Sequence, residues 1–185
     1  MTTWIVLRAA GIGAYVALFL AVAWGLIGTT SLVTKHVSKP AANSFHGTVA
    51  AAGLALLGIH LGGLLLDSFV PFHPLDLVVP MRTAYRPLAL AAGILAMYGL
   101  VLVLASSWMR KRIGTTWWRR VHALAIPVFA ASMLHGIFAG SDTDRPWMLW
   151  LYAGTGTITL FLIVVRAIML AYPPPRPARS PVLPA

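Results

Sequence analysis

Five apolar stretches, each about as long as a bilayer is thick, constrain this chain more than any other feature. They run approximately from Trp4 to Gly28, Asn43 to Leu66, Arg86 to Ser107, Thr116 to Ala139 and Trp147 to Ala171. A helix needs about 20 apolar residues to cross roughly 30 Å of hydrocarbon. Because 59% of the 185 residues are hydrophobic and only 10% are charged, one soluble core would not bury them. We therefore predict an all-α integral membrane bundle of five spans.

Prolines and helix-capping residues separate these stretches and predict the domain limits. Pro40 and the Asn43-Ser44 pair precede the second stretch, and Pro87 opens the third. Residues 1–171 are expected to form one transmembrane domain, followed by a disordered, proline-rich cytoplasmic tail over 172–185. The first stretch is too long for a signal-peptide core and lacks a clean cleavage site after it, so we interpret it as a retained span.

The distribution of charge predicts the orientation in the membrane. The chain has 14 Lys and Arg against 4 Asp and Glu, and the four acids are all Asp. Cations gather after the first and third stretches and in the tail, whereas the aspartates lie in or beside the other two loops. The positive-inside rule then places the N-terminus outside and the C-terminus in the cytoplasm of a multi-pass cell-membrane protein. Long apolar runs exclude a nucleic-acid binder, so the lipid bilayer is the expected partner of the basic loops.

The second and fourth stretches each carry two histidines at nearly equal spacing. His46 and His60 are fourteen residues apart, and His122 and His135 are thirteen apart. One span separates these stretches, so they run in the same direction, and at about 1.5 Å per residue each pair covers roughly 20 Å. If the spans are neighbours, His46 faces His122 near the inner leaflet and His60 faces His135 near the outer one. Each facing pair would hold one heme iron from both axial sides.

Two other interpretations of these histidines concern structure alone and zinc. An intramembrane histidine needs a partner, and hydrogen bonds between helices would supply one without any cofactor. Members of each helix pair lie too far apart for a four-ligand zinc site. The absence of cysteine excludes iron–sulfur ligation by this chain.

The thirteen-residue spacing of His122 and His135 does not place both side chains on the same face of an ideal helix. On an ideal helix, His135 lies roughly 140° around the axis from His122. Pro127 lies between them and removes one backbone hydrogen bond. It either kinks the helix and changes that angle, or is an ordinary membrane proline.

The paired histidine spacing, with the basic residues 110–112 before the fourth stretch, resembles the ferric reductase-like transmembrane domain. This family is the heme-carrying core shared by ferric reductases, NADPH oxidases and the heme-binding membrane subunit of the bacterial periplasmic methionine sulfoxide reductase system. The resemblance covers roughly residues 8–166. It implies two b hemes, held by the four histidines as paired above, that relay electrons across the membrane.

Two departures from the family pattern bear on the partners. Longer members have six spans and continue into a cytoplasmic flavin and nicotinamide domain, whereas this sequence has five stretches and a tail without a glycine-rich phosphate loop. The resemblance therefore implies an oxidoreductase electron-transfer subunit supplied by a separate flavoprotein, a bound flavin or a quinol. The outer acceptor would be a ferric complex, a periplasmic redox protein or oxygen. The alternative is a heme-free structural subunit that anchors a partner.

Heme propionates need cationic or polar partners near the membrane interfaces. Three cations near the outer ends of the first and third stretches are candidates for the outer heme: Arg8, Arg82 and Arg86. Four near the inner ends are candidates for the inner heme: Lys35, Lys39, Arg119 and Arg120. Arg8 is the most informative because it lies inside an apolar stretch, although an arginine near a helix end also extends to the headgroups.

Overall fold

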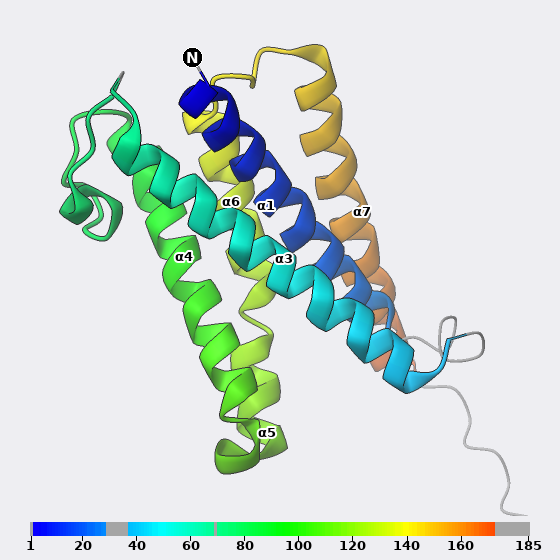
Figure 1. Ribbon diagram of the computed structural model, residues 1–185. Coiled ribbons are helices and arrows are strands. Elements are labelled where there is room, and N and C mark those ends of the chain that lie inside the picture. Colours follow the sequence, from blue (N-terminus) through cyan, green and yellow to red (C-terminus); the bar gives the residue numbers. More distant parts are fainter. Residues whose placement is uncertain (1, 29–36, 69, 173–185) are drawn as a thin grey trace, which may run out of the picture.

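The computed structural model describes residues 2–28, 37–68 and 70–172. This part of the chain is all-helical (Figure 1), with four helices long and apolar enough to cross a membrane and a bent helix pair that makes five if it crosses as one span. The predicted all-α membrane bundle is therefore confirmed. Lys35 and residues 173–185 of the expected tail lie outside the described residues.

The helices follow the apolar stretches closely. They are α1 (Thr2–Ile27), α3 (Lys39–Leu66), the 3-10 helix η1 (Pro74–Leu77), α4 (Pro87–Trp108), α5 (Arg110–His122), α6 (Ala125–Ala139) and α7 (Pro146–Ala171). The second span begins at Lys39 rather than Asn43, because Ser38 caps it: its hydroxyl accepts from the Ala41 N–H at 3.4 Å. Pro40 belongs to the first turn, where its missing N–H costs nothing.

The fourth span is two helices that meet at a bend of 42°. Pro127 has no N–H to donate to the Ala123 carbonyl, and the Ile126 N–H donates to that carbonyl instead, at 3.2 Å. The chain therefore breaks between α5 and α6, with Pro127 in the first turn of α6. A second break lies within α5 at Gly114, whose φ of 77° suits glycine. The predicted span began at Thr116, whereas α5 begins at Arg110, on the far side of that glycine.

The helices associate as two hairpins (Figure 1). α3 packs along α1, α4 packs along α5 and α6, and α1 also touches α6 and α7. The buried core lies where α1, α6 and α7 meet, around Tyr15, Phe129 and Tyr152. By contrast, α3 has no buried residue, and among the described elements its extensive contacts are with α1. The two histidine-bearing spans therefore face each other across a space instead of packing directly together.

Candidate functional site

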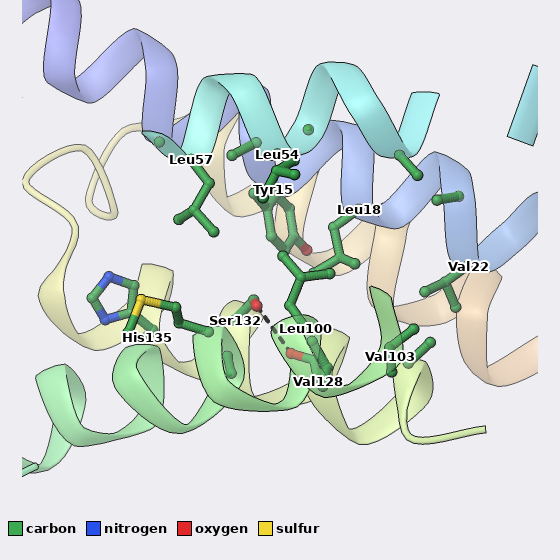
Figure 2. A pocket seen from close by; sticks show the side chains of 18 of the residues that line it. Tyr15, Leu18, Val22, Leu54, Leu57, Leu100, Val103, Val128, Ser132 and His135 are labelled. Carbon is green, nitrogen blue, oxygen red and sulfur yellow. Dashed lines mark hydrogen bonds between the residues drawn. The ribbon is translucent and has the colours of Figure 1, made fainter. Parts of the chain in front are cut away.

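A cavity of about 1480 Å³ occupies the space between the two hairpins, and all four histidines of the predicted pairs line it. Its walls are largely apolar: Figure 2 shows Leu54 and Leu57 of α3 opposite Leu100 of α4. Small-molecule pockets usually measure roughly 300–1,000 Å³, so this cavity has room for more than one ligand. The cavity has two ends. The loop end lies at the start of α1 and at residues 67–68 and 70–86, and the α5 end lies opposite it.

At the α5 end, His46 of α3 and His122 of α5 face each other. Their ring centroids are 6.0 Å apart and the ring planes are tilted by 56°. Metal–nitrogen bonds of about 2 Å on either side of one ion place two imidazole centroids about 6 Å apart. The Nδ1 atom of His46 is buried and has no hydrogen-bond partner among the described residues. The two rings thus have the separation of ligands that share a metal.

Ser107 and Trp118 support His122 at this end. The Ser107 hydroxyl lies 3.3 Å from His122 Nδ1, and Trp118 Nε1 donates to that same hydroxyl at 3.2 Å. The Trp118 ring also lies against the imidazole, with centroids 5.0 Å apart. These contacts hold the ring of His122 at the edge of the cavity.

At the loop end, His60 of α3 and His135 of α6 are each tied to the backbone of another helix. His60 Nδ1 donates to the Leu7 carbonyl at 2.8 Å, and His135 Nδ1 donates to the Ala89 carbonyl at 2.9 Å. A carbonyl only accepts, so both rings carry a proton on Nδ1 and leave Nε2 with its lone pair. Histidines that bind metals commonly have this arrangement. Figure 2 shows the His135 ring beside the cavity.

The break near Pro127 explains how one span presents both of its histidines to the cavity. His122 is the last residue of α5 and His135 belongs to α6. Because the two helices are bent at residues 123–124, the 140° offset of an ideal helix does not apply to this pair. The structure therefore brings two histidines to each end of the cavity, in the combinations that the sequence predicted.

The donor set has two protein ligands at each end. Among the described residues, no group of three or more His, Cys, Asp and Glu side chains is placed to hold a metal ion. A structural zinc ion takes four protein ligands. Pairs of facing imidazoles instead suit an ion whose other ligands belong to a macrocycle.

The three cations predicted for the outer propionates all have partners within the protein. Arg8 lines the cavity, donates from Nε to Asp142 at 2.8 Å and pairs through Nη2 with the other carboxylate oxygen. Arg82 pairs with Asp76 at 3.0 Å, and Arg86 donates to the Phe138 carbonyl at 2.6 Å. Neither Arg82 nor Arg86 lines the cavity. Of this group, Arg8 alone is in place to meet a ligand there.

At the α5 end, the predicted cations divide differently. Lys39 and Arg119 line the cavity, whereas Arg120 does not and lies over the Trp117 ring at 5.0 Å. Sequence reasoning missed Arg110 and Arg166, which also line the cavity. The position of Arg110 directly before the histidine-bearing span was a signal for it.

The two ends of the cavity consequently differ in charge. Four cations line the α5 end: Lys39, Arg110, Arg119 and Arg166. Three aspartates line the loop end, where Arg8 pairs with Asp142 and Arg82 pairs with Asp76: Asp67, Asp76 and Asp142. An anionic group is therefore stabilised far better at the α5 end than at the loop end.

In comparisons with known proteins, no family model, no curated protein and no solved structure matches the chain significantly. The resemblance to the ferric reductase-like domain thus rests on the histidine pattern. What the chain does has to be argued from the geometry of this cavity.

Proposed function

We propose that the protein is a di-heme b-type membrane cytochrome that relays electrons across the cell membrane, similar to the ferric reductase-like core. One observation carries the proposal: two histidines line each end of one apolar cavity, and at the α5 end the rings of His46 and His122 face each other. Two histidines at one site would hold a heme iron through their ring nitrogens, and a heme held in this way would supply one-electron transfer.

The residues present fit two hemes, His46 with His122 and His60 with His135. At the α5 end the fit rests on the 6.0 Å ring separation and on the unpaired, buried Nδ1 of His46. An unpaired buried nitrogen costs about 1–3 kcal/mol, which a ligand bonded to it would offset. At the loop end it rests on the two Nδ1–H bonds to carbonyls, which direct Nε2 to the metal.

The charge difference between the two ends supports propionate roles for the cavity-lining cations. We propose Lys39 and Arg119, joined by Arg110 and Arg166, for the heme at the α5 end. At the loop end we propose Arg8 as the propionate-binding cation. Its Nε and Nη2 donate to Asp142, so its Nη1 is the nitrogen that would donate to a propionate.

The same charges support an orientation with the α5 end in the cytoplasm and the loop end outside. Two hemes held along one cavity would divide roughly 30 Å of insulating hydrocarbon into shorter electron steps. Electrons would enter at the α5 end from a separate flavoprotein, a bound flavin or a quinol. They would leave at the loop end to an outer redox acceptor.

A pyridine hemochrome assay with an absorbance spectrum of the purified protein tests the proposal. We expect about two b hemes per chain, and about one in His60→Ala and in His46→Ala. The double variant should bind none. Two hemes retained by His60→Ala would show that the pairing is wrong.

The second candidate function is a heme-free structural subunit. The observation that favours it is the same pair of bonds from His60 and His135 to backbone carbonyls, because histidines that only join helices make such bonds. This candidate predicts a colourless protein after expression with ample heme, still able to assemble with its partner.

A further inference from the structure

We propose that Gly11 and Gly93 are positioning residues that set the location and the tautomer of the two loop-end histidines. The inference rests on the proposed function, because it concerns the imidazoles assigned to one heme iron. It concerns how the ligands are held, and neither glycine would touch the iron.

We call a backbone carbonyl that is followed four residues later by a glycine, with a histidine ring against both, a cradle. The first cradle is on α1, at Leu7 and Gly11. The His60 ring donates to the Leu7 carbonyl and lies directly against Gly11, one helical turn further on. A Cβ atom built on Gly11 would lie 2.8 Å from His60 Nδ1 and 3.0 Å from its Cε1. Such distances are too short for real contacts, so any side chain at residue 11 would displace the imidazole.

The second cradle, on α4, repeats the first. His135 donates to the Ala89 carbonyl and lies against Gly93, again one turn further on. A Cβ on Gly93 would lie 2.6 Å from His135 Nδ1 and 2.8 Å from its Cγ. Each hairpin therefore places one histidine by the same combination of a carbonyl at position i and a glycine at i+4.

Helix geometry explains why the glycine must follow its carbonyl by four residues. In an α-helix the carbonyl of residue i points toward the N–H of residue i+4. Side chains tilt toward the helix N-terminus, so the Cβ of residue i+4 covers that carbonyl. A glycine at i+4 uncovers it, and a ring nitrogen from a neighbouring helix can then share the carbonyl with the backbone.

The α5 end lacks this arrangement. A Cβ on Gly25 would lie 3.8 Å from His46 Cε1, which is an ordinary contact. His122 faces Ser107, which carries a side chain, instead of a glycine. We therefore expect Gly25→Ala to leave His46 in place. The effect of a glycine-to-alanine change on a histidine should thus be confined to the loop end of the cavity.

The test is Gly93→Ala in the full-length purified protein, with heme quantified by pyridine hemochrome. We expect binding at the loop-end site to weaken about 10–100-fold, the usual effect of losing the hydrogen bond that orients a metal-binding histidine. Gly93→Ala should then retain about one heme, at the α5 end. The double variant Gly93→Ala/His60→Ala should still bind that heme, whereas Gly93→Ala/His46→Ala should bind none. Gly11→Ala, on the other hairpin, should behave in the same way and serves if Gly93→Ala fails to fold.

Two matched alanine variants separate positioning from packing. A Cβ on Gly99 would lie 2.4 Å from Val128 Cγ2, so Gly99→Ala strains the same α4–α6 contact without touching a histidine. Gly62 has open space around it, close in sequence to His60. Both variants should keep two hemes. Loss of the loop-end heme in Gly99→Ala would overturn the proposal, and so would unchanged heme affinity in both Gly93→Ala and Gly11→Ala.

A second measurement reads the tautomer directly. In heme-free protein, ¹⁵N NMR of the imidazoles should show His60 and His135 protonated on Nδ1, and Gly11→Ala should abolish this for His60 alone. If the rings of His60 and His135 in the wild-type protein were protonated on Nε2 instead, the proposal that the glycines set the tautomer would be wrong. Wild-type protein that binds no heme under any condition would instead overturn the proposed function, so the two failures are distinguishable.

Discussion

At the scale of single residues, the ion pair between Arg8 and Asp142 shows how the loop end holds charge inside an apolar bundle. Asp142 is 8% exposed and receives two N–H groups of one guanidinium. A carboxylate in such a place is stable only while its counter-charge is present. The pair also joins the start of α1 to the connection between α6 and α7, which are far apart in sequence.

We predict that Asp142→Asn lowers the free energy of unfolding by about 1–3 kcal/mol, because it removes charge-assisted hydrogen bonds of that strength. Thermal unfolding in detergent measures the change. Asp144→Asn is the matched control, since Asp144 is two residues away and exposed. Equal stability of the two variants would contradict the prediction.

At the scale of elements, the broken fourth span decides where the histidines point. If Pro127 were alanine, its N–H would bond to the Ala123 carbonyl and α5 could continue into α6. His122 and His135 would then lie roughly 140° apart around one axis, and only one of them would face the cavity. We predict that the Pro127→Ala variant binds about one heme per chain in the hemochrome assay, against about two for the wild type.

The control for this variant is Pro146→Ala. Pro146 occupies the first turn of α7, where a proline is well tolerated and its replacement changes no helix axis. Its heme content should match the wild type. Two hemes in Pro127→Ala would mean that the bend does not depend on the proline.

The same element shows what sequence could and could not predict. The lengths of the spans follow from hydrocarbon thickness, so four of the predicted stretches match single helices within a few residues, whereas the fourth stretch is a bent helix pair that begins at Arg110. Pro127 indicated a place for a bend, but the angle depends on which N–H group bonds to the carbonyl that the proline leaves without its usual donor. The break at Gly114 escaped prediction because a lone glycine is compatible with both a helix and a positive φ.

At the scale of the whole molecule, the pairing of helices depends on tertiary contacts that a single sequence does not contain. Sequence reasoning paired the histidines on the condition that the two histidine-bearing spans are neighbours, and it could not show that α3 packs on α1 and faces the other span across the cavity. The contacts of Gly11 and Gly93 with the histidines could not be predicted from the sequence either, because both glycines lie on spans without histidines. The histidines themselves were predictable because an unpartnered polar ring in lipid is costly.

The orientation of the bundle is the last property that the charges predict, and in the proposed relay it decides which end would receive electrons. The chain contains no cysteine, so a single introduced cysteine reports its own side of the membrane. Lys111 at the α5 end and Asp144 at the loop end are both exposed. With cations kept in the cytoplasm, a membrane-impermeant maleimide should label Asp144→Cys in intact cells and Lys111→Cys only after lysis. The reverse pattern would place the cation-lined end outside, where an electron donor from the cytoplasm would not reach it.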